Sequence, residues 1–392
     1  MRTYKGKKEK KISLKKHIHI ICILCALVVV INVAAWMAPV LHDKFGIGNW
    51  CDAYVSYVTP VVVGSFSRIA NLFSFSVGEV MLVLACLLIL FMAGACVAGI
   101  FFLFKEKKVP LFIKRFYIVF AYIFVIVCLV MSGNCIIFYH TTPLSFTEEE
   151  KEYSLAELEK LRNEIVGKCE WYAKQVKRDE EGYLVYEGDM QETAKKALLG
   201  LADEFSHLKG YYPRVKHMFF SGLMSQAYME GYYFPFSMEA NCNAKMYLSQ
   251  YPSVYCHELS HLHGYIYEDE ANFLSYLACV KSEDTFFRYC GYLSVLYYVD
   301  NAYYDSVQDI ERYNSQPQIS QRVHDDNTFV LSDTWEEVEE HAILSTETLD
   351  TASDALIDTS LNLNGVEDGK ASYARVVELL LQYYENAGDS FP

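Results

Sequence analysis

Two histidines flank a glutamate at a spacing of four residues in the segment CHELSHLHG, residues 256–264. On a helix, His257 and His261 lie on one face, so both imidazoles can reach the same metal ion. Glu258 is rotated by about 100° from His257, within reach of a water molecule bound to that ion. Zinc lowers the pKa of such a water toward 7, and the glutamate accepts its proton as the water attacks a carbonyl. The spacing therefore predicts one Zn²⁺ ion on His257 and His261, with Glu258 as the catalytic base.

A third protein ligand is expected from the acidic segment YEDEANF, residues 267–273, because a catalytic zinc site uses three ligands and an open position. Glu268 and Asn272 are four residues apart and share a helical face. We predict that Glu268 binds the metal and that Asn272 hydrogen-bonds a histidine ring and fixes its tautomer. Glu270 points about 200° away from Glu268, so one helix cannot direct both at the metal, and Glu270 stays the alternative ligand.

The surroundings of the motif favour a buried helix. The small apolar run SVYC precedes His257, and a buried helix does not normally carry a glutamate and two histidines without partners. Gly264 is a natural end for that helix. His263 is about 200° from His261 around the axis, so we expect it at the surface or behind the ligands.

Three apolar runs come before this region, at residues 19–40, 77–104 and 116–139. Each has the length of about 20 residues that crosses the hydrocarbon core of a membrane. Residues 1–139 contain 15 Lys and Arg against 5 Asp and Glu, whereas residues 140–392 contain 19 against 44. The net charge therefore changes from positive to negative at about residue 140. Together with the apolar runs, this change predicts a basic cytoplasmic tail at 1–18, a three-span transmembrane region at 19–139 and a separate domain at 140–392.

The distribution of basic residues predicts the orientation of these spans. The first 16 residues carry 8 Lys and Arg and the loop 105–115 carries 5, whereas the loop 41–76 carries only Lys44 and Arg68. Cytoplasmic loops are the ones enriched in Lys and Arg. We therefore expect a multi-pass protein of the cell membrane, with a cytoplasmic N-terminus and an extracytoplasmic domain at 140–392. The loop 41–76 is expected to lie along the outer interface or to pack against that domain.

The domain at 140–392 is predicted to be rich in helices, with a small β-sheet. Ser154 and Glu157 fit a capping box before a helical pattern, and residues 372–388 form the last clear helix. Residues 210–243 are rich in aromatic residues and glycine, which favours one or two strands. Its five cysteines are an odd number without paired spacing, so at most one or two disulfides are expected.

The segment GYYFPF, residues 231–236, is the best candidate for an edge strand, because proline is tolerated at sheet edges. Such a strand could bind a substrate by pairing with its backbone, and we place Tyr233, Phe234, Glu239 and Asn241 in the cleft. The alternatives are a structural edge packed on the helix, and, for Glu239 and Asn241, support of the site or capping of the next segment. The oxyanion-stabilising group stays open among the tyrosines 297, 298, 303 and 304 and His324.

The motif HExxH followed by a helix with ExxA(D/N) resembles the gluzincin metallopeptidases. The chain resembles more closely, over nearly its whole length, a bacterial membrane family catalogued as domain of unknown function 3810. The shared features are three N-terminal spans, Pro235–Asn241 as PFxxEAN, His257–Gly264 as HExxHxxG, and Glu268–Phe273 within EDEANF. The resemblance implies a gluzincin-type, zincin-like domain with a zinc peptidase site but names no substrate. The gap from His261 to Glu268 is shorter than in better-known gluzincins.

The expected function is that of a membrane-anchored zinc metallopeptidase that hydrolyses peptide bonds on the outer face of the cytoplasmic membrane. Its partners would be the lipid bilayer and a protein or peptide substrate. An acidic domain of net charge −25 without a phosphate-binding loop argues against nucleic acid. The alternative is a non-catalytic, zinc-containing membrane sensor or interaction protein.

Overall fold

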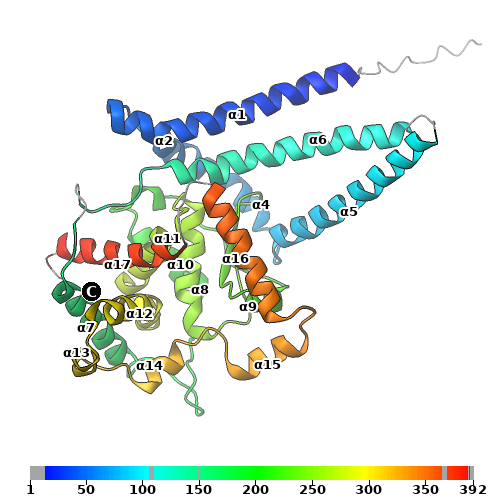
Figure 1. Cartoon of the computed structure of the whole chain (residues 1–392). Coiled ribbons are helices and arrows are strands. Elements are labelled where there is room, and N and C mark those ends of the chain that lie inside the picture. Colours follow the sequence, from blue (N-terminus) through cyan, green and yellow to red (C-terminus); the bar gives the residue numbers. More distant parts are fainter. Residues whose placement is uncertain (1–13, 106–109, 148–150, 364–368, 387, 389–392) are drawn as a thin grey trace, which may run out of the picture.

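Three long helices extend away from a helical domain that is formed by the rest of the chain (Figure 1). The computed structural model describes residues 14–105, 110–147, 151–363, 369–386 and 388. The tail at 1–13, which holds six of the eight basic residues counted in the first 16 positions, lies outside the described residues.

The long helices are α1 (Leu14–Phe45), α5 (Val77–Phe104) and α6 (Leu111–Met131), the last continued by a π-helical turn at Ser132–Ile136. All three are long and apolar enough to cross a membrane. Most of their apolar side chains are exposed along the helices, as lipid-facing surface would be. The three predicted spans are therefore confirmed as helices that could cross a membrane, and the start and end predicted for the second coincide with α5. The predicted orientation stays a prediction.

The connection between α1 and α5 packs against the large domain, which is one of the two positions predicted for the loop 41–76. It contains α2 (Trp50–Tyr57), α3 (Thr59–Val62), a π-helical turn at Val63–Ser67 and α4 (Arg68–Ala70). The Ser67 hydroxyl donates to the Met238 carbonyl at 2.5 Å. The Arg68 guanidinium lies over the Tyr211 ring at 4.1 Å from its centroid.

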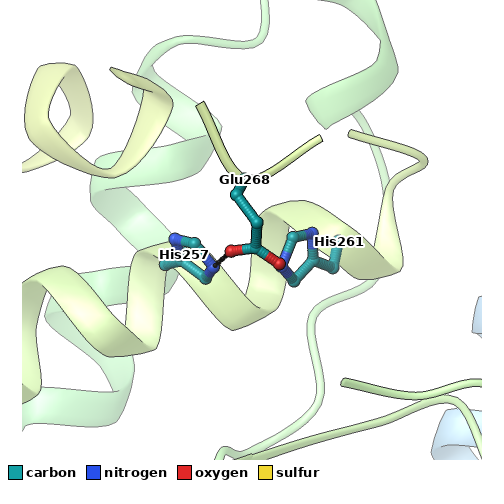
Figure 2. A group of neighbouring side chains, drawn as sticks. All are labelled: His257, His261 and Glu268. Carbon is teal, nitrogen blue, oxygen red and sulfur yellow. Dashed lines mark ion pairs between the residues drawn. The ribbon is translucent and has the colours of Figure 1, made fainter. Parts of the chain in front are cut away.

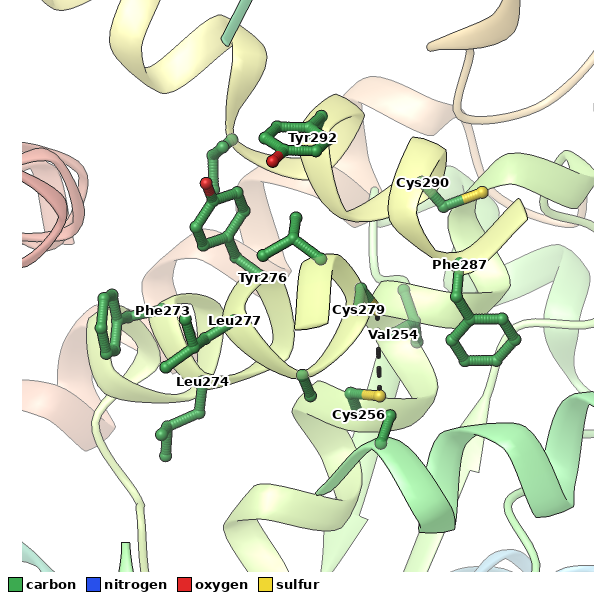
Figure 3. Close-up of a cluster of buried hydrophobic side chains, with 14 of the residues drawn as sticks. Val254, Cys256, Phe273, Leu274, Tyr276, Leu277, Cys279, Phe287, Cys290 and Tyr292 are labelled. Atoms are coloured by element: carbon green, nitrogen blue, oxygen red, sulfur yellow. Dashed lines mark hydrogen bonds between the residues drawn. The ribbon is translucent and has the colours of Figure 1, made fainter. Parts of the chain in front are cut away.

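The core of the domain surrounds helix α11, which contacts several other helices and is apolar on most of its circumference. The helices of this core are α7 (Leu155–Tyr172), α8 (Met190–Gly200), α10 (Tyr251–Leu262), α11 (Glu268–Lys281), α12 (Thr285–Val307) and α17 (Gly369–Asn386). Figure 3 shows Phe273, Leu274 and Leu277 of α11 directed into this core. The predicted capping box is confirmed at the start of α7, where Ser154 and Glu157 bond reciprocally. The last predicted helix corresponds to α17.

A small sheet lies beside α10. Its strands are β1 (Lys216–His217), β2 (Gly231–Phe234) and β3 (Glu239–Cys242), in the order β1-β3-β2. Strands β2 and β3 pair antiparallel, whereas β1 runs parallel to β3. The sheet thus has three strands where one or two were predicted, and β2 is an edge strand, as expected from the proline that follows it.

Shorter elements complete the described part of the domain. The helices are α9 (Ser221–Gln226), α13 (Ile310–Ser315), α14 (Gln321–Asp326), α15 (Ser332–Glu340) and α16 (Thr346–Leu363), with single 3₁₀ turns at Phe138–His140, Ser206–Leu208 and Leu248–Gln250. Helices α15 and α16 pack against α9. All twelve cysteines are free thiols, and the sulfurs of Cys256 and Cys279 lie 4.0 Å apart (Figure 3).

Candidate metal centre

Helix α10 carries the histidines and is buried between α8, α11 and the sheet. Pro252 lies in its first turn, where a missing N–H costs nothing. The helix ends at Leu262, and Gly264 follows with φ of +93°. A β-carbon at Gly264 would lie 2.5 Å from a methyl group of Val55 in α2. Glycine is therefore needed both for the backbone turn and for the close approach of α2.

His257, His261 and Glu268 converge on one point between α10 and the start of α11 (Figure 2). His257 Nε2 is 3.1 Å from Glu268 Oε2, and His261 Nε2 is 3.6 Å from Glu268 Oε1. One ligand atom from each residue lies within 4.8 Å of the other two. Ligand atoms about 2.1 Å from a tetrahedral zinc ion are about 3.4 Å apart. The donor set and its spacing therefore fit one zinc ion.

Hydrogen bonds to the far side of both imidazoles fix their orientation. His257 Nδ1 is 2.9 Å from Asn272 Oδ1, which is the contact predicted for Asn272. His261 Nδ1 is 2.7 Å from the carbonyl oxygen of Tyr265. With Nδ1 donating in both rings, each Nε2 presents its lone pair toward Glu268. No pattern in the sequence predicts the Tyr265 contact, because this contact depends on the turn after Gly264.

Glu258 is buried beside these ligands with one carboxylate oxygen unsatisfied. Its side chain is 5% exposed, and Oε2 has no hydrogen-bond partner among the described residues. Burial raises the pKa of Glu258 to about 8. Leaving a buried carboxylate oxygen without a donor is costly. A cation or a water molecule at the ligands would compensate for that cost, so the residues present fit a metal and its water.

The charges of the three ligands are complementary. Burial opposes the proton on His257, but the adjacent Glu268 carboxylate outweighs burial and raises the pKa of His257 to about 9. The charges of His261 and His257 lower the pKa of Glu268 to about 2. Burial lowers the pKa of His261 to about 4. The side chain of Glu268 is 54% exposed, so the ligand group is open to solvent on the α11 side.

The alternative third ligand faces away from the histidines. Glu270 Oε1 accepts a hydrogen bond from the Leu144 amide at 2.7 Å and lies 3.6 Å from the Arg375 guanidinium. Burial raises the pKa of Glu270 to about 8. Glu270 therefore fastens the start of α11 to the segment after α6, and the structure brings Glu268 rather than Glu270 to the histidines.

His263 is buried, so the expectation of a surface position is wrong. It is 2% exposed, its Nδ1 lies 2.8 Å from the His207 carbonyl, and its ring stacks on Tyr212 at 4.3 Å between centroids. Helix α10 has neighbours on the face opposite the ligands as well. That side of the helix is part of the core, so His263 is buried behind the helix that carries the ligands, which is the other position expected for it.

The four residues expected in a substrate cleft are all at most 7% exposed. The Tyr233 hydroxyl donates to the Asn134 carbonyl at 2.8 Å, and the Phe234 ring packs on Gly78 of α5. Glu239 forms a buried ion pair with Lys216, and Asn241 donates to the Tyr232 carbonyl at 3.2 Å. These contacts are those of the alternative interpretation, a structural edge packed against its neighbours.

The backbone of strand β2, in contrast, directly adjoins the candidate base. A β-carbon at Gly231 would lie 2.2 Å from Glu258 Oε1. The residue before it, Glu230, is exposed, and its charge acts on both His257 and Glu258. Sequence reasoning missed Glu230, and its place directly before the predicted edge strand was the one available signal.

The candidates for oxyanion stabilisation make contacts elsewhere. Tyr297 and His324 bond to each other at 2.7 Å between α12 and α14. The Tyr303 hydroxyl donates to Glu159 of α7 at 2.6 Å. Tyr304 is 52% exposed and packs edge-on against the Tyr313 ring. None of these contacts involves His257 or His261, so the structure does not single out an oxyanion donor among these candidates.

Comparison with protein families matches residues 54–381 to the family described as "Protein of unknown function (DUF3810)". The chain belongs to this family. The matched region begins within α2 and ends within α17, so it includes α5, α6, the sheet and every residue of the candidate metal centre. No curated protein and no solved structure matches the chain. The family description assigns no function, so the chemistry of the site has to be argued from its residues.

Proposed function

We propose that this member of the DUF3810 family is a membrane-anchored zinc metallopeptidase with a gluzincin-like site. His257, His261 and Glu268 would hold one zinc ion, and Glu258 would be the general base. The observation that supports this most is the convergence of these three ligands beside a buried carboxylate that has an unpartnered oxygen. The combination matches the needs of metal-assisted hydrolysis, namely a metal-binding group, an open side and a base.

The residues of the chain have distinct roles in this proposal. A bound zinc ion supplies a Lewis acid that polarises a carbonyl and brings the pKa of water near 7. Asn272 and the Tyr265 carbonyl hold the two imidazoles in the tautomer that binds metal. Glu258 takes a proton from the attacking water and delivers it to the amine that leaves. The free edge of β2, whose other edge pairs with β3, offers backbone groups to an extended peptide.

The test compares the purified full-length chain with Glu258→Gln, measuring zinc by mass spectrometry and cleavage of a fluorescently labelled unfolded protein. The variant should keep one zinc per chain and lose hydrolysis by about 10²-fold or more, since general-base catalysis contributes about 10²–10⁴. Glu270→Gln is the matched control, because Glu270 is an equally buried glutamate directed at Arg375. Equal hydrolysis by wild type and Glu258→Gln would rule out Glu258 as the base.

The alternative, a non-catalytic zinc protein, makes a different prediction about the ligands. Structural zinc sites are closed by four protein ligands, often with sulfur. Cys256 adjoins His257 in sequence, but its sulfur lies in the core 4.0 Å from that of Cys279. X-ray absorption of the zinc-loaded chain should therefore show nitrogen and oxygen neighbours. Sulfur bonded to zinc would favour the non-catalytic function.

We further propose that the domain at 140–392 lies on the outer face of the cytoplasmic membrane, with the N-terminus inside. The asymmetry of Lys and Arg between loops supports this orientation. Alkaline phosphatase fused after Pro392 should be active, and a fluorescent protein that matures only in the cytoplasm should stay dark. A bright fluorescent fusion with an inactive phosphatase would reverse the orientation and place the substrates inside the cell.

A further inference from the structure

The sheet beside the candidate metal centre is bonded to the first turn of α5. Glu239 of β3 accepts hydrogen bonds from the backbone amides of Val77 at 3.1 Å and Gly78 at 2.7 Å. Its charge complements the positive end of the helix dipole. Glu239 also pairs with the buried Lys216. One end of a helix that could cross a membrane is therefore fixed directly to the strand that packs on α10.

A second carboxylate makes the reverse connection, from α5 to the domain. Glu79 accepts hydrogen bonds from the backbone amides of Phe219 at 2.9 Å and Phe220 at 2.7 Å. Lys216 donates to the carbonyls of Ala70 at 2.7 Å and Phe75 at 2.9 Å. The turn before α9 and the turn before α5 are thus held together around the point where α5 begins.

The third apolar helix is fastened to the edge strand. Asn134, in the π-helical turn that follows α6, donates to the Pro235 carbonyl at 2.8 Å. Its own carbonyl accepts the hydroxyl of Tyr233 at 2.8 Å. Strand β2 is therefore tied at one end to α6 and packs on α5 through Phe234, while Gly231 at its other end contacts Glu258. Only the length of strand β2 therefore separates the candidate base Glu258 from the ends of α5 and α6.

Exposed apolar side chains gather at this junction and are called the apolar rim below. Its two segments, residues 72–75 and 219–223, flank the start of α5, and the bonds from Lys216 and Glu79 hold them there. The members of the rim are Leu72, Phe73, Phe75, Phe219, Phe220 and Leu223, with Leu72 and Phe219 the most exposed at 81% and 87%. Aromatic residues next to the end of a transmembrane helix are typical of the membrane–water interface. The rim continues the lipid-facing surface of α5, so its occupant is the boundary between lipid headgroups and acyl chains.

We propose that the apolar rim seats the large domain on the bilayer, so that the metal centre acts on peptide segments that membrane-anchored substrates present close to the lipid surface. The substrate class rests on the peptidase function proposed above, whereas the seating of the rim does not. A soluble protein or a distant loop would reach the centre only by approaching the bilayer. A chain that emerges from the membrane beside α5 and α6 would reach the edge of β2 within a short extended segment.

Lipid cross-linking tests the seating without any enzymatic reaction. The full chain is reconstituted in phosphatidylcholine vesicles that contain a lipid with a diazirine near its headgroup, irradiated and digested for mass spectrometry. Adducts are expected on peptides that cover residues 66–75 and 217–224. Ile310 is the control, because it is 55% exposed and belongs to α13, a helix on the opposite side of the domain from the three long helices (Figure 1). Adducts confined to α1, α5 and α6 would overturn the seating.

A second experiment tests whether the site prefers substrates close to the lipid surface. The protein is loaded with zinc in the same vesicles and is given a pool of mixed-sequence peptides, each attached to an acyl chain. In one pool a spacer of two residues keeps the peptides at the surface. In the other, a proline-rich spacer of about 20 residues holds them about 60 Å away. The short-spacer pool should be cleaved at least tenfold faster, and Glu258→Gln should abolish the cleavage. If both pools are cleaved at the same rate and Glu258→Gln abolishes both cleavages, the substrate class is overturned but the peptidase function is not. No cleavage of either pool, or of the labelled unfolded protein, would overturn the peptidase function with it.

Discussion

Replacing Gly231 by alanine should displace the candidate base without touching a metal ligand. The added β-carbon would lie 2.2 Å from Glu258 Oε1 and 2.6 Å from its Cδ and Cγ. Normal contacts between such atoms are about 3.3 Å or longer, so the carboxylate has to move by about 1 Å. The backbone of Gly231 does not have a positive φ, so alanine itself adds no conformational strain. The change therefore acts through Glu258.

The size of both effects follows from this overlap. A misplacement of about 1 Å at a reacting group costs about 10²-fold in rate, and we expect Gly231→Ala to lower hydrolysis by about that factor. Overpacking of a buried contact costs about 1–3 kcal/mol, which should appear in the free energy of unfolding. Zinc content should remain at one ion per chain, because the three atoms nearest to the added β-carbon all belong to Glu258 and none to His257, His261 or Glu268.

The assay measures peptide cleavage, bound zinc and denaturant unfolding of the full-length chain in detergent. Gly222→Ala is the matched control, since a β-carbon at that helical glycine meets nothing within 4 Å. The double variant Gly231→Ala, Glu258→Asp tests the mechanism, because the shorter side chain leaves room for the methyl group. The stability cost of Gly231→Ala should be smaller by about 1 kcal/mol or more in the Glu258→Asp background. An equal cost in both backgrounds, or full activity of Gly231→Ala, would refute the reasoning.

Three further outcomes follow from contacts described above. Asn272→Ala removes the partner of His257 and should weaken zinc binding by about 10–100-fold, as measured by competition with a chelating dye. Lys216→Met leaves Glu239 buried without its cation and should lower the free energy of unfolding by about 3–5 kcal/mol, a loss that Glu239→Gln in the same chain should partly restore. Burial lowers the pKa of His263 to about 4, below the value of about 6.5 in an unfolded chain, so the folded state binds fewer protons and loses stability as the pH falls from 6.5 toward 4. In His263→Phe that loss should shrink by up to about 3 kcal/mol, and an unchanged pH profile would contradict the assignment.

The features that the sequence predicted well are those fixed by local periodicity. A single continuous apolar run that crosses a membrane has to form a helix, because only a helix satisfies its own backbone hydrogen bonds there. The run at 77–104 forms α5 with the same bounds. The spacing of four residues brought His257 and His261 to one face, and the same spacing brought Asn272 to the imidazole while Glu268 meets both rings. Helical geometry determines these relations whatever the rest of the chain does.

The features that the sequence did not predict depend on contacts between distant segments. Glu239 accepts a hydrogen bond from the backbone of Val77, 162 residues earlier, and no local pattern signals that a strand carboxylate caps the long apolar helix α5. Strand β1 has two residues and exists only because it pairs with β3. The sequence left His263 either at the surface or behind the ligands, and its burial depends on His207 and Tyr212, which lie about 50 residues earlier in the chain.

The candidate metal ligands lie within a segment of twelve residues, from His257 to Glu268, whereas the bonds that hold the domain to α5 and α6 join residues at least 99 positions apart. Closing a short loop costs little chain entropy compared with closing a long one. The ligand cluster can therefore form early in folding, and the docking on the long helices has to come later. A measurement of zinc content would then report on a folding intermediate as well as on the finished protein. A cellular quality-control system that recognises only bound metal would accept chains that contain zinc but whose domain has not yet docked on the long helices.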